Sequence, residues 1–151
     1  MRAAASICIL VVLLTVGCDP AGLRRVQLRL TSAPAFSGRI SVDSPDVQEA
    51  LEILDTVVTQ HGFQVKTNYS DQKTHGYVRL YSMDAPAQQP ATIPCYVRLT
   101  ATGVRVEFGD LSFAYTYRAA DAAFNDTSAA LIKRYGKKNV RSHVYMPDKD
   151  S

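Results

Sequence analysis

The feature that most constrains this chain is an apolar run close to its N-terminus. Arg2 supplies a positive charge, residues 7–16 are almost entirely apolar, and small residues follow up to Cys18. This order of charged, apolar and small-residue regions is typical of a secretory signal peptide, which is removed from the mature protein. As a helix the run would measure about 15 Å, against roughly 30 Å for the hydrocarbon core of a bilayer. We therefore expect residues 1–17 to be a signal and to contribute nothing to the fold.

The end of this segment, Leu14-Thr15-Val16-Gly17-Cys18, resembles the lipobox of bacterial lipoproteins. In that class a dedicated peptidase cuts before the cysteine, whose sulfur carries a diacylglycerol and whose new amino group is usually acylated with a chain such as palmitate. The resemblance implies that Cys18 is the lipidation site. Thr15 departs from the family's pattern, which most often has leucine there. Two or three acyl chains make a stable anchor, because each buried methylene contributes about 0.8 kcal/mol and one chain alone binds marginally.

The residues after Cys18 bear on where the anchored domain lies. Residues 18–23 form a short tether, which reaches at most about 17 Å to the first predicted strand when fully extended. We therefore expect the domain to face the periplasm of a bacterial cell envelope, close to a membrane. Asp19 resembles the signal that retains enterobacterial lipoproteins in the inner membrane, and the outer membrane is the alternative. If the signal is an ordinary one, the protein is instead a soluble periplasmic or secreted domain.

Length and charge limit the mature protein to a few classes. Removing residues 1–17 leaves 134 residues, which suits a single domain, expected over residues 24–145 with a flexible tail at 146–151. Without Arg2 the chain has 16 Lys and Arg residues against 14 Asp and Glu, a formal net charge of +2. This balance lacks the strong positive field of a nucleic-acid-binding protein.

Cys95 is the one cysteine expected to carry a free thiol, since Cys8 leaves with the signal and Cys18 is lipidated. Cys95, Val97 and Leu99 share one face of a predicted strand, because side chains alternate along a strand with a period of two. We expect Cys95 to be a buried core residue. An intermolecular disulfide or a reactive thiol is the alternative.

Alternating apolar residues predict the strands. The expected strands cover residues 24–30, 39–42, 63–67, 77–81, 95–101, 104–108, 111–117 and 140–145. The strands at 95–101 and 104–108 form a predicted hairpin, whose turn we expect Gly103 to allow through a positive φ. A loop with three prolines precedes this hairpin.

Apolar residues spaced three and four apart predict two helices. The first has Ser44 as its N-cap, Pro45 at its first position and Gly62 as its stop. The second begins near residue 119 and stops at Gly136. Helices and strands that each have one apolar face predict an α+β fold, a two-layer sandwich with two helices on one face of an antiparallel sheet. The specific arrangement that we expect is ferredoxin-like with an extra hairpin.

The sequence contains no recognisable catalytic or metal-binding motif. His61, His75 and His143 are far apart, and none has a partner at metal-ligand spacing. No glycine-rich phosphate loop and no serine-nucleophile motif is present. We therefore predict no catalytic residue, cofactor or metal, and an enzyme with a site that motifs do not reveal is the alternative.

Three groups of residues are candidate interaction surfaces. Arg24, Arg25 and Arg29 follow the tether and are placed to meet anionic lipid headgroups. A second group of cations surrounds Gly136, and tyrosines on neighbouring strands form a ligand-binding face if the register brings them together. These residues are Lys133, Arg134, Lys137, Lys138 and Arg141, and Tyr77, Tyr81, Tyr96, Tyr115 and Tyr117. An ordinary solvated surface is the alternative for each group.

These observations predict a membrane-anchored envelope lipoprotein that acts as a non-catalytic binding or assembly subunit. Its expected partners are a membrane, reached through the lipid on Cys18, and a protein of the envelope. Nucleic acid is not an expected partner.

Overall fold

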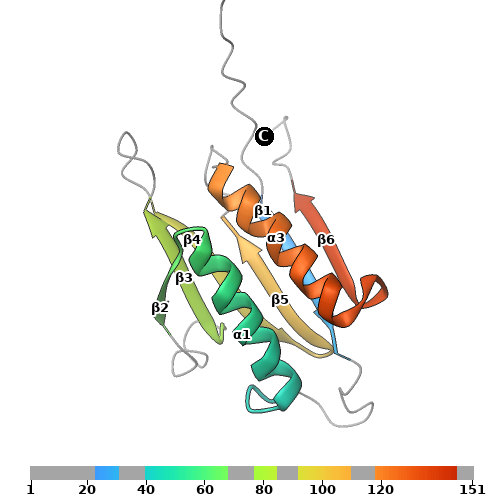
Figure 1. The fold of residues 1–151 in the computed structure, drawn as a ribbon. Helices are drawn as coiled ribbons and strands as arrows, with labels where there is room; N and C mark the ends of the chain where they lie inside the picture. The colour runs from blue at the N-terminus through green and yellow to red at the C-terminus, as the bar shows by residue number, and fades with distance from the viewer. Residues whose placement is uncertain (1–22, 31–39, 68–76, 85–91, 110–117, 146–151) are drawn as a thin grey trace, which may run out of the picture.

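The computed structural model shown in Figure 1 describes residues 23–30, 40–67, 77–84, 92–109 and 118–145. Within these ranges a six-stranded sheet carries two α-helices on one face, which confirms the predicted α+β two-layer sandwich. In chain order the elements are β1 (Leu23–Arg29), α1 (Pro45–Gln60), β2 (Gln64–Thr67), β3 (Arg79–Asp84), β4 (Thr92–Thr100), β5 (Gly103–Phe108), α3 (Arg118–Tyr135), the short 3₁₀ helix η2 (Lys137–Asn139) and β6 (Val140–Tyr145). Cys18, the strand predicted over 111–117 and the predicted tail lie outside the described residues.

The strand order is β2-β3-β4-β5-β1-β6, and every pair in the described sheet is antiparallel. Strands β2 to β5 follow one another along the chain and pair as a meander, while β1 lies between β5 and β6. Across β6-β1-β5-β4 this is the strand order of the ferredoxin-like arrangement that we expected, in which two β-α-β units interleave. Strands β2 and β3 extend the sheet beyond β4 and form the extra hairpin.

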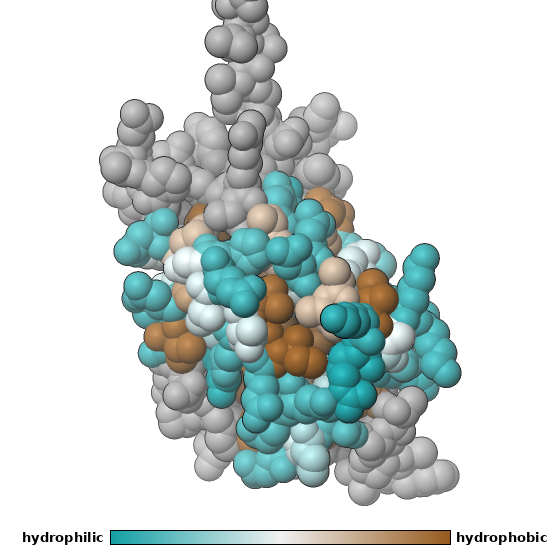
Figure 2. All heavy atoms as spheres, in the orientation of Figure 1, coloured by the Kyte–Doolittle hydropathy of each residue, from teal (hydrophilic) through white to brown (hydrophobic). Residues whose placement is uncertain are grey.

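One face of the sheet and the inner sides of α1 and α3 form the core. The predicted inward set of the hairpin is confirmed, because Cys95 pairs with Phe108, Val97 with Val106, and Leu99 with Val104. Phe108 lies at the centre, with its ring centroid 5.9 Å from that of Phe63 and 6.4 Å from that of Phe124. The buried side of α1 is the predicted one: Val47, Ala50, Leu51, Leu54 and Val58. Seen from the helix side in Figure 2, the described surface is mostly hydrophilic, with several small, separate apolar areas.

Two glycines end helices as predicted, and a third has a different role. Gly62 and Gly136 have φ angles of 86° and 84°, in the left-handed region that glycine tolerates best. Gly103 does not have the positive φ that we expected. A Cβ atom on Gly103 would lie 1.9 Å from the backbone oxygen of Leu28, so the glycine allows β1 to approach β5 closely.

The short strand predicted over 39–42 is wrong for the described residues, since residues 40–43 have no strand pairing. Val42 is nevertheless buried, and its carbonyl accepts a hydrogen bond of 2.7 Å from the Gln48 side chain. The alternation in this segment therefore places apolar side chains under the start of α1. In the described part of the chain, neither helix has the length and apolar character needed to cross a bilayer.

Candidate functional site

The two faces of the sheet differ in what lies against them. Strand residues that face α1 and α3 make up the covered face, and the alternate residues point the other way, where the described residues place no helix. We call this second surface, on strands β4, β5, β1 and β6, the open face. Its aromatic, charged and amide residues are Tyr96, Arg98, Arg105, Glu107, Arg25, Gln27, Arg29, Arg141, His143 and Tyr145.

Strand register arranges the arginines of the open face in a row. Arg98 of β4 lies directly opposite Arg105 of β5, Arg105 opposite Gln27 of β1, and Gln27 opposite Arg141 of β6. Like charges directly opposite one another destabilise a sheet. The sequence therefore places three cations in one row across four strands at a cost in stability.

Glu107 is the one carboxylate among these open-face residues, and it lies in the neighbouring row. Its side chain accepts hydrogen bonds from Arg25 Nε at 2.8 Å and from Arg98 Nε at 3.2 Å. Glu107 is only 8% exposed, so the two guanidinium groups lie over a nearly buried acid. One carboxylate against five arginines leaves the open face strongly positive.

Aromatic rings hold the two arginines that Glu107 binds. The Arg25 guanidinium lies 4.7 Å from the centroid of the Tyr145 ring and donates a 3.0 Å hydrogen bond to its hydroxyl. The Arg98 guanidinium lies 5.3 Å from the Tyr96 ring centroid and 6.0 Å from that of Tyr77. These cation–π contacts fix both guanidinium groups, as such contacts do when a cation lies within about 6 Å of a ring.

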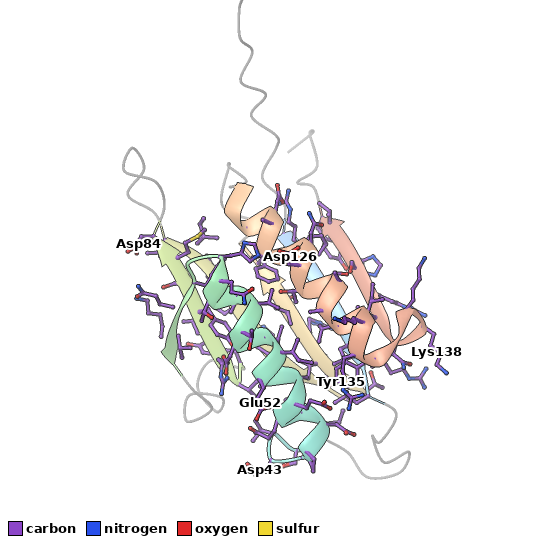
Figure 3. All side chains as sticks on the ribbon, in the orientation of Figure 1. Asp43, Glu52, Asp84, Asp126, Tyr135 and Lys138 are labelled. Atoms are coloured by element: carbon purple, nitrogen blue, oxygen red, sulfur yellow. The ribbon has the colours of Figure 1, made fainter. Side chains whose placement is uncertain are left out.

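A pocket of about 210 Å³ lies at one end of this surface. Three cations line it, together with three uncharged polar residues: Arg29, Lys138 and Arg141, with Gln27, Thr102 and Asn139. Lys138 lies just beyond the C-terminal end of α3 (Figure 3). The pocket is at the Arg29 end of β1, about 20 Å from Leu23 at a rise of roughly 3.3 Å per residue.

The structure divides the two cation clusters that the sequence suggested. Arg24 does not join Arg25 and Arg29, because strand alternation turns it to the covered face, where it is buried and pairs with Asp121 of α3. Arg134 is bound by both carboxylate oxygens of Glu49, at 2.6 and 2.8 Å.

The remaining members of the two clusters meet in space. Arg29 of the first cluster lines the pocket together with Lys138 and Arg141 of the second. None of these three cations forms an ion pair with a carboxylate in the described part of the chain. Sequence reasoning identified all three residues but did not bring them together, since the pairing of β1 with β6 was not known.

The structure brings together two of the five tyrosines of the predicted ligand-binding face, and one of the two, Tyr77, is itself buried. Tyr77 and Tyr96 lie together, with ring centroids 5.6 Å apart, and Tyr115 and Tyr117 fall outside the described residues. Tyr81 instead faces α1 and is fully buried. The reason is the register of β3, which places Tyr81 opposite Cys95 on the covered face.

Sequence reasoning missed a polar contact between α1 and β3. Asp55 of α1 accepts a 2.5 Å hydrogen bond from the Tyr81 hydroxyl and pairs with Arg79. Burial, and then the hydrogen bond to Asp55, raises the pKa of Tyr81 far above its usual value. Tyr81 therefore stays protonated as a donor to Asp55, an arrangement that joins helix and sheet and provides no activated nucleophile.

The cysteine and the histidines, which are the remaining candidates for reactive or metal-binding residues, lie in separate places. Cys95 is fully buried, as predicted, and burial raises the pKa of its thiol well above the usual value. His61, at the end of α1, lies 2.9 Å from a carboxylate oxygen of Asp126, which is labelled on α3 in Figure 3. His143 is on the open face, and His75 is outside the described residues. Among the residues that the structure describes, no group of three or more His, Cys, Asp or Glu side chains is suited to hold a metal ion.

No protein-family model matches this chain, and no similar protein was found among curated proteins or solved structures.

Proposed function

We propose that this protein is a lipid-anchored subunit of a bacterial envelope assembly, and that its open face binds an acidic surface of a partner protein without catalysing a reaction. The observation that carries the proposal is the concentration of charge on that face. The mature chain is nearly neutral, yet the open face has five arginines and one glutamate. Arginine is well suited to an interface of this kind, because its planar guanidinium binds carboxylates through two parallel hydrogen bonds.

Arg105 is the strongest single indication of a missing partner. It lies in the middle of the arginine row, and its Nε atom is buried without a hydrogen-bond partner among the described residues. A buried donor left unpaired costs about 1–3 kcal/mol. A carboxylate from an acidic partner, placed beside the Arg105 guanidinium, would reduce the repulsion between Arg98 and Arg105.

The predicted anchor is compatible with such an interface. A lipid on Cys18 would hold the Leu23 end of β1 near the bilayer, because the predicted tether is short. Strand β6 ends at the same edge of the sheet, since Leu23 pairs with Tyr145. The rest of the open face then extends away from the membrane, within reach of another envelope protein.

The proposed interface on the open face can be tested by measuring the size of the complex that contains this protein. We expect wild-type protein, extracted from native host membranes in mild detergent, to migrate in a complex larger than the monomer. Arg105→Glu reverses one charge in the centre of the open face and should release the monomer. Lys137→Glu makes the same change in charge at an exposed residue of η2 and should leave the complex intact. Wild-type protein that migrates as a monomer, or a complex that survives Arg105→Glu, contradicts the proposal.

The anchor requires a separate experiment. Intact protein extracted from native membranes should have the mass of residues 18–151 plus a diacylglycerol and an acyl chain. Cys18→Ala should remove membrane association and should lead to accumulation of the precursor. A mature mass without lipid would refute the anchor and would favour the soluble periplasmic or secreted alternative.

A further inference from the structure

The pocket at the Arg29 end of β1 brings together cations from three separate segments. Arg29 comes from β1, Lys138 from η2 and Arg141 from β6. The pairing of Gln27 with Arg141 fixes β6 beside β1, and the Asn139 side chain donates a 2.7 Å hydrogen bond to the carbonyl of Tyr135, which ties η2 to the end of α3. The regular elements of the fold therefore hold these residues around a common space.

The charge of this pocket is not balanced by the described part of the protein. Its lining contains three cations and no carboxylate. By contrast, Arg24, Arg25, Arg79 and Arg134 each pair with an acid. Three like charges around a common space repel one another, so a bound anion would stabilise the arrangement.

We infer that this pocket binds a phosphate-bearing anion. Two arginines supply planar forks that bind phosphate oxygens in pairs, and a lysine supplies a compact point charge. A phosphate monoester carries close to two negative charges at neutral pH, which suits three cations better than a single carboxylate does. Gln27, Thr102 and Asn139 line the same space with uncharged polar side chains.

The size of the pocket limits what the phosphate carries. A volume of about 210 Å³ is smaller than the roughly 300–1,000 Å³ of pockets that enclose drug-sized ligands. The pocket therefore takes a phosphate group with a small substituent. A soluble phosphate monoester and the headgroup of a phosphate-monoester lipid present the same chemistry, and the experiment below distinguishes the two sources.

The first arm measures free phosphate. Full-length mature protein in neutral phosphatidylcholine nanodiscs is titrated with inorganic phosphate at low ionic strength by calorimetry. We expect saturable binding that weakens as sodium chloride is added, because the pocket is open to solvent. Lys138→Gln combined with Arg141→Gln should weaken binding by at least about tenfold, as expected for the loss of two charge-assisted contacts. Lys133→Gln combined with Lys137→Gln removes the same charge from residues that do not line the pocket, and should change binding less than about twofold.

The second arm tests the lipid source with a residue-specific readout. Phenylglyoxal modifies accessible arginines, and mass spectrometry reports the extent at Arg29 and Arg141. Protection by added phosphate in neutral nanodiscs indicates a soluble ligand. Protection without added phosphate, in nanodiscs that contain phosphatidic acid, indicates a lipid headgroup. Either pattern supports the phosphate site.

Two results would overturn the inference. The first is the absence of both saturable phosphate binding and protection by phosphatidic acid. The second is an equal loss of phosphate binding in the two double variants, which would show that general surface charge is responsible. The pocket does not include Arg105, so a failure here leaves the partner-binding role of the open face to its own test.

Discussion

Consecutive residues of the same strands build two surfaces of opposite character. On β5, Val106 and Phe108 point into the core under the helices, whereas Arg105 and Glu107 point to the open face. The covered face also contains two arginines, and the helices supply a carboxylate for each, although Arg79 Nε and Thr127 Oγ1 are buried there without a hydrogen-bond partner among the described residues. Asp121 of α3 pairs with Arg24, and Asp55 of α1 with Arg79.

The open face has no comparable balance within the described residues. Glu107 satisfies Arg25 and Arg98, while Arg29, Arg105 and Arg141 form no ion pair there. The two faces therefore differ in charge balance: each covered-face arginine has a carboxylate partner, whereas three arginines of the open face have none among the described residues. The covered face forms the core of the domain, and the open face is the surface for which we propose anion binding.

The largest loss of stability is expected for a substitution in the core under the helices. Phe108→Ala should destabilise the protein by about 3–5 kcal/mol, because it removes a buried ring that contacts Phe63 and Phe124. Urea denaturation followed by circular dichroism measures the loss. Arg105→Ala on the same strand is the matched control and should change stability by less than about 1 kcal/mol. Similar losses in both variants would show that the two faces do not differ as described.

A smaller loss of stability is expected for a substitution of Glu107, which binds two arginines of the open face. Glu107→Gln should destabilise the protein by about 2 kcal/mol at low salt, because it leaves two arginine side chains without their shared carboxylate. The loss should shrink when sodium chloride is raised to about 0.5 M, since salt screens repulsion between the two guanidinium groups, which are partly exposed. Thermal unfolding at both salt concentrations provides the measurement. A loss that does not depend on salt would indicate that packing, and not charge, holds this face.

The hydrogen bond between Tyr81 and Asp55 on the covered face should make the stability of the protein depend on pH in the alkaline range. Folding raises the pKa of Tyr81, first by burial and then through Asp55, so the unfolded chain loses the phenol proton near pH 10 while the folded chain retains it. Stability is therefore fully present below about pH 10 and falls above it, by about 1.4 kcal/mol per pH unit from this residue. Tyr81→Phe should remove this part of the slope in urea titrations between pH 9 and pH 11.

A second tyrosine supplies the control for this pH dependence. Burial, and then the charge of Glu49, raises the pKa of Tyr135 to about 12. Tyr135 adds its own loss of stability between pH 10 and pH 12, and Tyr135→Phe should leave the contribution of Tyr81 in place. A slope that is the same in wild type and in Tyr81→Phe would contradict the role assigned to Tyr81.

The last prediction involves no loss of stability and concerns the reactivity of Cys95 on the covered face. Its thiol is fully buried and its pKa is raised by burial, so the native protein should react with Ellman's reagent at least about a hundredfold more slowly than the urea-unfolded chain. Absorbance at two urea concentrations measures both rates. Rapid reaction of the native thiol would indicate that this part of the core opens readily.

Much of the fold follows from local patterns in the sequence. Spacings of three and four predicted α1 and α3 with their glycine stops, and alternation predicted the inward residues of β1, β4 and β5. These signals are local because they depend only on which face of an element is apolar. The prediction of a strand over 39–42 failed for its described residues, 40–42, where Ile40 and Val42 are buried without strand pairing.

The site was less predictable, because it depends on long-range pairing. The three pocket cations were known as residues, but their convergence requires β6 to pair with β1 across more than a hundred residues of chain. The role of Tyr81 was missed for a similar reason. Its strand carries charged and apolar residues on both faces, so alternation alone does not choose which face is buried.

The most direct test of the account compares arginine reactivity in two settings. Native host membranes and purified protein in phosphate-free buffer are treated with phenylglyoxal, and mass spectrometry reports modification at each arginine. We predict that Arg29, Arg105 and Arg141 are protected in the membranes relative to the purified protein, because a partner or an anionic ligand occupies the open face. Arg134, which pairs with Glu49 on the helix side, should react equally in both settings. Equal reactivity of all four arginines in the two settings would contradict the account.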